Sequence, residues 1–103
     1  MNKYGLHGKL QAKAGSGDEL TDILLEAAKM LRAAKGCQLY VIGKDKDDPD
    51  ALWITEIWDT REDHDNSLKD QAVRALITRA IPLLDGPPAK GQELQVLGGF
   101  GIS

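Results

Sequence analysis

The stretch Leu52-Trp53-Ile54-Thr55-Glu56-Ile57-Trp58-Asp59-Thr60 decides how the rest of the chain is interpreted. It is rich in β-branched and aromatic residues, which predicts a strand. Successive residues of a strand point to opposite faces, so Trp53 and Ile57 share one face while Glu56 and Trp58 share the other. Because both faces are mostly apolar, both must be covered by other parts of the fold. The exception is the single carboxylate of Glu56, in the middle of one face.

A short helix is predicted directly after this strand. Thr60 has the residue type of an N-cap, and the acidic Asp63 follows three residues later. The helix should run from Arg61 to about Lys69, where Leu68 is the apolar side chain that defines the inward face. His64 lies four residues before Leu68 and therefore shares that face. The turn at Thr60 should bring His64 towards the carboxylate-bearing face of the strand.

The N-terminal part predicts a strand followed by a long helix. Polar and apolar residues alternate from Tyr4 to Ala14, as in a strand with one wetter face. Ser16 and Glu19 form a capping-box pattern, in which the serine side chain accepts from first-turn amides and the glutamate reaches back. Apolar residues then recur at helical spacing until Ala34, and Gly36 is suited to the left-handed position after a helix.

The remaining elements complete an alternating order. A strand at Cys37–Lys44 is joined to the central strand by the polar loop 45–50, which predicts a hairpin. A second long helix should begin at Asp70 or Gln71, and Pro82 should loosen its last turn. Three apolar residues mark a last strand: Leu94, Val96 and Leu97.

The order β-α-β-β-α-β predicts an α+β, ferredoxin-like fold with both helices on one face of an antiparallel sheet. The chain of 103 residues is expected to form a single domain, 1–103. Two helices cover only one face of the sheet, although the central strands are apolar on both. A second copy of the chain is the economical cover for the other face, so a homodimer is predicted.

Composition argues against several classes of protein. The net charge is −3 and the basic residues are dispersed, which disfavours nucleic-acid and anionic-membrane partners. No apolar run approaches the roughly 20 residues of a membrane span, and no signal-peptide core is visible. The single cysteine, Cys37, fits a reducing cytoplasm. Without a His-x-His or His-x-x-x-His pair, no metal site is predicted.

Two motifs identify a family. Glu56-Ile57-Trp58 and Asp63-His64-x-x-Ser67-Leu68 resemble the antibiotic biosynthesis monooxygenase family, in particular its small quinol-monooxygenase-like members. Further segments extend the likeness over essentially the whole chain: Gly36-Cys37, Tyr40, Asp48-Pro49 and Gly98-Gly99-Phe100-Gly101. The resemblance implies a dimeric α/β barrel that oxidises an electron-rich aromatic, such as a quinol or an anthrone, with O₂. It also implies that no metal, haem or flavin is needed.

His64 is the predicted catalytic base, because an imidazole titrates at about pH 6.5 and can take a phenolic proton. Its alternative is a partly exposed histidine in an acidic helix. Glu56 is the second predicted catalytic residue, either orienting His64 or holding a substrate hydroxyl. Its alternative is a sheet carboxylate paired with a cation or a backbone amide, since a buried acid needs a partner.

Five residues are candidates for substrate binding. Trp58 would wall a cavity on the helix side, although an aromatic in a sheet is more often core. Tyr40 would lie at the pocket edge or in the dimer interface. Asn66 and Ser67 would hydrogen-bond a ligand, unless Ser67 only caps a helix break. Arg74 would clamp an anionic substrate, unless it is simply solvated.

Two other functions remain open at this point. Haem-degrading relatives carry their haem-ligating histidine about ten residues beyond the tryptophan, whereas His64 lies six beyond Trp58 and Leu68 occupies the more distant position. A small-molecule-binding, signalling or stress protein of the same fold, without catalysis, is the alternative from a different class.

Overall fold

The computed structural model describes residues 2–88 and 90–102, so the two ends of the predicted domain, Met1 and Ser103, lie outside the described residues. Its elements follow one another as β1 (Lys3–Gln11), α1 (Gly17–Leu31), β2 (Cys37–Lys44), β3 (Ala51–Trp58), α2 (Arg61–Ser67), α3 (Gln71–Ala80), a 3₁₀ turn (Ile81–Leu83) and β4 (Gln92–Val96). The predicted α+β, ferredoxin-like order is confirmed, with the short α2 inserted before the second long helix.

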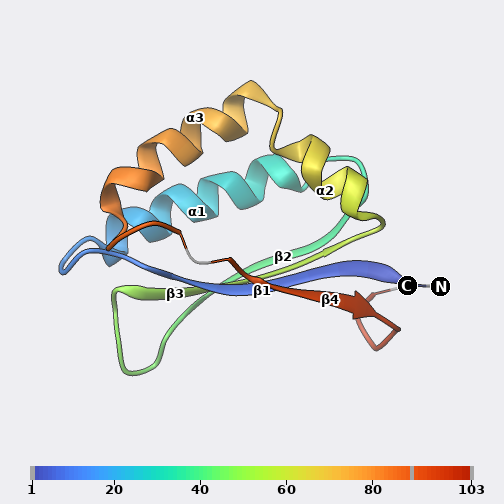
Figure 1. Cartoon of the computed structure of the whole chain (residues 1–103), viewed down its shortest axis with the longest axis horizontal. Helices are drawn as coiled ribbons and strands as arrows, with labels where there is room; N and C mark the ends of the chain where they lie inside the picture. The colour runs from blue at the N-terminus through green and yellow to red at the C-terminus, as the bar shows by residue number, and fades with distance from the viewer. Residues whose placement is uncertain (1, 89, 103) are drawn as a thin grey trace.

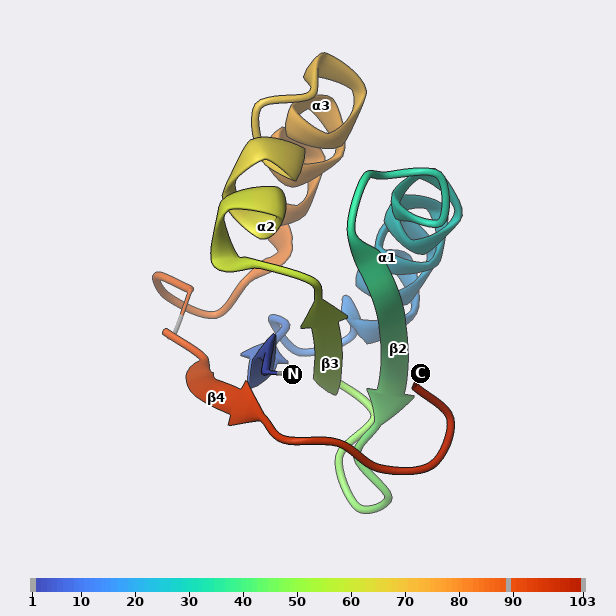
Figure 2. The same ribbon diagram turned by 90° about the vertical axis from the view of Figure 1, so that its right-hand side faces the viewer.

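The four strands form one open antiparallel sheet in the order β2-β3-β1-β4. The predicted hairpin of β2 and β3 is present. Helices α1 and α3 lie side by side on one face of the sheet, and no helix or strand formed by residues 2–88 and 90–102 covers the opposite face (Figure 1). Seen end on, α2 stands above the end of β3, next to α3 (Figure 2).

The core lies between the sheet and the two long helices. Its larger cluster is built from Leu20 and Leu24 of α1, Leu52 of β3 and Leu76 of α3. A smaller cluster joins Leu31, Trp58 and Val73 at the end of the sheet where α2 begins. The site described below lies against this smaller cluster.

The two tryptophans of β3 lie on opposite faces of the sheet, as the strand alternation predicts. Trp58 is 0% exposed beneath the helices, whereas Trp53 is 37% exposed on the open face. Val41 and Leu94 lie on the same open face, because they stand opposite Thr55 and Gly5 respectively in the ladder. Both side chains are exposed. An apolar sheet face is therefore left uncovered within one chain.

The first strand is shorter than predicted, because β1 ends at Gln11 and not at Ala14. Beyond that point the chain leaves the sheet and pairs with loops. The Ala12 N–H donates to the Asp50 carbonyl at 2.7 Å, and the Lys13 N–H donates to the Leu83 carbonyl at 2.8 Å. Alternation in the sequence continues past the point where these loop contacts replace the strand ladder.

The predicted capping box at the start of α1 is wrong. Ser16 occupies the N-cap position but its side chain makes no capping hydrogen bond. The carboxylate of Asp50, from the loop before β3, accepts from the Gly17 N–H at 2.9 Å and from the Gly15 N–H at 3.1 Å. A charged acceptor from a distant loop has displaced the local serine at this helix N-terminus.

Several predicted ends also shift. Helix α1 stops at Leu31 before a turn, although Gly36 has the predicted positive φ of 81°. Helix α2 stops at Ser67, and Leu97 lies beyond the end of β4. The 3₁₀ turn around Pro82 is the loosened end expected for the second long helix.

Candidate active site

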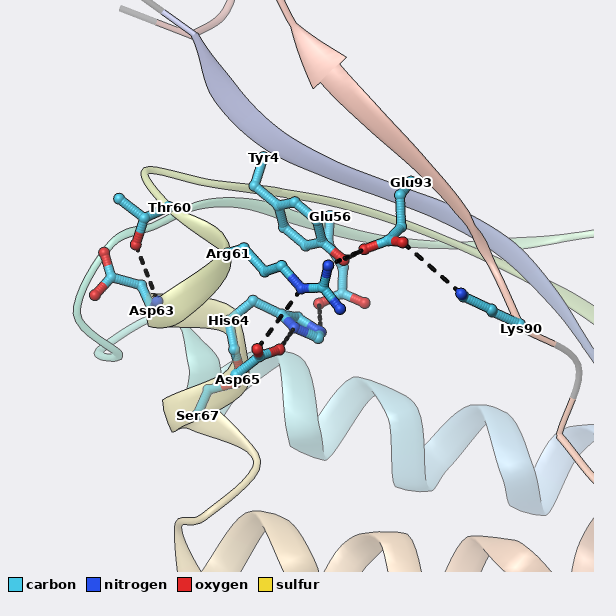
Figure 3. Close-up of polar contacts among 10 residues, drawn as sticks. All are labelled: Tyr4, Glu56, Thr60, Arg61, Asp63, His64, Asp65, Ser67, Lys90 and Glu93. Atoms are coloured by element: carbon cyan, nitrogen blue, oxygen red, sulfur yellow. Dashed lines mark hydrogen bonds and ion pairs between the residues drawn. The ribbon is translucent and has the colours of Figure 1, made fainter.

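His64 is positioned by the cap of α2. Thr60 is the N-cap, as predicted, and its hydroxyl accepts from the Asp63 N–H at 3.0 Å. This cap fixes the helix directly after β3, so that one turn later the imidazole points back over the sheet (Figure 3). The His64 side chain is 12% exposed, and its Nε2 lies 3.9 Å from Oε1 of Glu56. The structure therefore brings these two predicted residues together.

Glu56 is enclosed beneath the helices and has a hydrogen-bond donor on its own strand. The indole N–H of Trp58, two residues further along the same face, donates to Oε1 of Glu56 at 3.0 Å. Burial raises the pKa of the Glu56 carboxyl, while the Trp58 hydrogen bond and the nearby His64 oppose the rise. Glu56 can therefore hold a proton at a higher pH than an exposed glutamate can.

Trp58 connects the site to the core. Its edge meets the His64 ring in a T-shaped contact with centroids 5.8 Å apart. Because the indole is fully buried, its N–H needs a partner, and Glu56 supplies that partner. One side chain therefore holds the carboxylate and one edge of the imidazole.

Asp65 contacts the other nitrogen of the imidazole. Its Oδ1 lies 2.9 Å from Nδ1 of His64, and its side chain is 54% exposed. Nδ1 therefore faces a carboxylate at the protein surface, while Nε2 faces Glu56 in the interior. A proton on Nδ1 would donate to Asp65 and leave Nε2 as an acceptor, which is how a carboxylate selects a histidine tautomer.

Tyr4 packs against His64 from β1, although the sequence pattern places it only at the start of the first strand. Its ring lies 5.4 Å from the imidazole centroid. The Tyr4 hydroxyl donates to Oε2 of Glu93 at 2.9 Å, and Arg61 lies 3.4 Å from the same oxygen. Burial and the Glu93 carboxylate raise the pKa of Tyr4 to about 12.

Sequence reasoning missed this outer cluster of Tyr4, Arg61, Asp65 and Glu93, which Figure 3 shows around His64. Tyr4 lies opposite Trp58 in the β1–β3 ladder and opposite Gln95 in the β1–β4 ladder. The available signal was the pairing of the first strand with the central strand, because that register places Tyr4 beside the tryptophan.

A cavity of about 100 Å³ lies between the sheet and the helices beside these groups. Its polar wall contains Tyr40, Glu56, His64 and Ser67, and apolar residues of α1 and α3 close the remainder. Burial beside Glu56 raises the pKa of the Tyr40 hydroxyl above its ordinary value of 10.0. The cavity thus offers an apolar space with an imidazole and a carboxyl on one side.

The predicted binding residues are placed differently from one another. Tyr40 lines the cavity, whereas Trp58 is a fully buried core residue and is not among the residues that line it. Ser67 lines the cavity, but its hydroxyl donates to the His64 carbonyl at 2.6 Å, so it also fastens the end of α2. Asn66 is exposed and lies on the outer side of α2. Arg74 is exposed on α3 and does not line the cavity.

Residues 2–88 and 90–102 contain no group of three or more histidine, cysteine, aspartate or glutamate side chains that could hold a metal ion. None of the helices in these two ranges combines the length and apolar character that crossing a bilayer requires.

The fold and the cavity together define the class of the protein: a ferredoxin-like α+β domain with a small, enclosed site between its sheet and its helices. Residues 4–79 match the family model described as antibiotic biosynthesis monooxygenase. The chain belongs to this family, and the resemblance drawn from its motifs is confirmed.

Solved structures agree with this assignment. A protein from Chloroflexus aurantiacus J-10-fl, provisionally named an antibiotic biosynthesis monooxygenase, is 40% identical, with a TM-score of 0.88 and coverage of 98% of this chain and 99% of that one. A protein of unknown function from Nitrosomonas europaea is 25% identical, with a TM-score of 0.80 and coverage of 96% and 93%. A Caulobacter crescentus protein, named like the first, shares the fold at 15% identity, with a TM-score of 0.85 and coverage of 94% and 92%. No curated protein matches the chain.

Proposed function

We propose that the protein is a cofactor-independent monooxygenase that oxidises a quinol- or anthrone-like aromatic with O₂. The observation that carries the proposal is the pair formed by His64 Nε2 and Glu56 Oε1, 3.9 Å apart beside an apolar cavity. A substrate hydroxyl placed about 2.8 Å from each atom can donate its proton to Nε2. Its oxygen can at the same time accept a hydrogen bond from Glu56 when that carboxyl is protonated, a form that burial favours. A base for the proton and a donor for the developing oxyanion are what proton removal from a phenol requires.

The reaction begins with proton transfer from the substrate hydroxyl to His64 Nε2. The electron-rich anion passes one electron to O₂, and the resulting aryl radical and superoxide combine to form a C–O bond. With an anthrone-like substrate, one oxygen atom stays as the new carbonyl and the other leaves as water with the two hydrogens of that carbon. All four electrons come from the substrate, so no external reductant is needed.

The remaining residues serve this proton transfer. Asp65 holds the proton on Nδ1 of His64, which keeps Nε2 free to accept. The apolar side chains from α1 and α3 that line the cavity exclude water, which strengthens the electrostatic interactions within it. Glu56 holds the substrate hydroxyl against the imidazole. The roles of Asp65 and Glu56 are therefore positioning and binding, while His64 moves the proton.

Oxygen consumption tests this function. Purified protein mixed with a panel of hydroquinones and anthrones should consume O₂ faster than the same compounds alone, without added flavin or metal. Turnover should survive a chelator, because no step uses a metal. Turnover that is abolished by a chelator, or that appears only with flavin, would contradict the cofactor-free mechanism. Saturable binding without turnover would instead indicate a small-molecule-binding protein.

We further propose that the working unit is a homodimer joined through the open face of the sheet. Val41, Trp53 and Leu94 are exposed on this face, which would be an unusual concentration of apolar surface for a monomer. A second sheet covering them would bury the face that the helices leave free. The single, half-buried Cys37 has no partner for a disulfide within the chain, which agrees with a cytoplasmic location.

The dimer is tested by charge insertion. Val41→Lys places an ammonium group on β2 within the proposed interface and should produce a monomer at micromolar concentration, as measured by sedimentation. Leu25→Lys is the matched control, because Leu25 is similarly exposed but lies on α1, away from the sheet face. A wild-type protein that sediments as a monomer would disprove the proposal.

A further inference from the structure

A second, larger hollow lies beside the cavity, between the end of α1 and the helices α2 and α3. We call it the outer groove, and its volume is about 520 Å³. Its floor is apolar and includes Met30, Ala34, Ala72 and Val73. Figure 2 shows the elements that carry these residues: the end of α1 faces α2 and the start of α3.

The outer groove adjoins the inner cavity directly. Leu31, Ser67 and Val73 line both spaces, so the wall between them is a single layer of side chains. Ser67 is fastened to the His64 carbonyl, which places this shared wall next to the proposed catalytic base. A molecule whose hydroxyl contacts His64 would therefore need to pass only this layer to reach the groove.

The two volumes suggest a division of the substrate. Ligand pockets commonly measure about 300–1,000 Å³, and the inner cavity of about 100 Å³ is well below that range. The outer groove, at about 520 Å³, falls within it. The inner cavity has room for the reacting ring and little more, so any additional part of a substrate must lie elsewhere.

Four polar side chains stand at the rim of the outer groove: Lys35, Asp63, Asn66 and Asp70. Asp70 caps α3 by accepting from the N–H groups of Ala72 and Val73 at 2.9 and 3.1 Å. Asp63 packs against Gly36, where any added Cβ would collide with its carboxylate. These contacts fix the rim and leave an apolar floor, which favours an uncharged hydrocarbon over a polar or charged group.

We propose that the outer groove is a substrate subsite that binds an alkyl substituent on the aromatic ring held at His64 and Glu56. The identity of the ring rests on the proposed function, whereas the presence of the subsite rests on the groove and its shared wall. The substrate class narrows accordingly to quinols that carry an apolar side chain.

Binding without oxygen tests the subsite separately from the reaction. Methylhydroquinone and hexylhydroquinone are titrated anaerobically while the tryptophan fluorescence is followed, since Trp58 lies beside the cavity. Each buried CH₂ contributes about fourfold in affinity, so the hexyl compound should bind at least about tenfold more tightly even with partial burial. Ala72→Phe fills the groove and should abolish this advantage while leaving the affinity for methylhydroquinone unchanged.

Ala75→Phe is the matched control, because Ala75 is also exposed on α3 but lines neither space. It should keep the preference for the hexyl compound. Three results would overturn the subsite. The wild-type protein could bind the two compounds equally well, or it could bind neither of them. Alternatively, Ala72→Phe and Ala75→Phe could lose the preference for the hexyl compound to the same extent. A chain-length preference without any O₂ consumption would support the subsite and contradict the monooxygenase reaction. Turnover that is independent of chain length would support the monooxygenase reaction and contradict the subsite.

Discussion

His64→Gln should lower turnover roughly 100-fold or more, which is the usual scale for losing a general base. Glutamine retains a polar side chain of similar reach but cannot take the substrate proton at neutral pH. The fold should remain intact, because α2 buries no residue fully and is held by its Thr60 cap. Oxygen consumption by the variant, compared with its circular dichroism spectrum and sedimentation, measures the effect.

The second histidine of the chain provides a matched control. His7 lies on the open face of the sheet, where it stacks on Trp53 and hydrogen-bonds to the Thr55 hydroxyl at 3.0 Å. His7→Gln should therefore keep near-wild-type turnover. The turnover of Asp65→Asn should lie between those of His64→Gln and His7→Gln. Asparagine keeps the shape of the side chain, but it no longer holds the proton on Nδ1 of His64 as a carboxylate does. A folded His64→Gln dimer with unchanged turnover would show that the imidazole is not the base.

Trp58→Ala should lower the free energy of unfolding by about 3–5 kcal/mol, which is the range for removing a fully buried aromatic side chain. The loss is a large fraction of the roughly 5–15 kcal/mol that stabilises a typical domain. The cavity would open in the cluster with Leu31 and Val73, directly beneath the site. Urea unfolding measures the change. Trp53→Ala, on the exposed face, should cost less, and equal losses would contradict the assigned burial.

Trp58→Phe separates the packing from the hydrogen bond. Phenylalanine keeps most of the apolar contact but removes the N–H that donates to Glu56, at a cost of about 1–3 kcal/mol for a buried acceptor left without its partner. Because burial raises the pKa of Glu56, the folded protein holds this proton more tightly than the unfolded chain. The corresponding stability is fully present below the ordinary glutamate pKa of 4.5 and is lost as the pH rises through the folded pKa.

The variant should therefore show a pH-dependent difference from wild type. Without the indole N–H, the ionised carboxylate is less stabilised and the pKa of Glu56 should rise further. The difference in unfolding free energy should be small in acid, where the carboxyl is protonated in both proteins, and larger at neutral pH. A difference that is constant with pH would show that the hydrogen bond does not affect the ionisation of Glu56.

The sequence by itself determined the order of the elements and the two faces of the central strand. The alternation along β3 separates Trp58 and Glu56 from Trp53, and the Thr60 cap with the i, i+4 spacing of His64 and Leu68 turns the imidazole inwards. These features depend on contacts within a few residues of each other, which periodicity and capping residues describe well. The sequence also identified the family, because its motifs lie in this same stretch.

Only the tertiary structure decided which groups surround that stretch. Asp50 replaced Ser16 as the cap of α1. Tyr4 contacts both His64 and Glu93 only because β1 lies between β3 and β4 in the sheet. The outer groove likewise depends on how the end of α1 faces α2 and α3. Such contacts join residues far apart in the chain, so local sequence patterns do not predict them. The physical reason is that strand order and helix packing are selected by burial over the whole domain, whereas caps and faces are selected residue by residue.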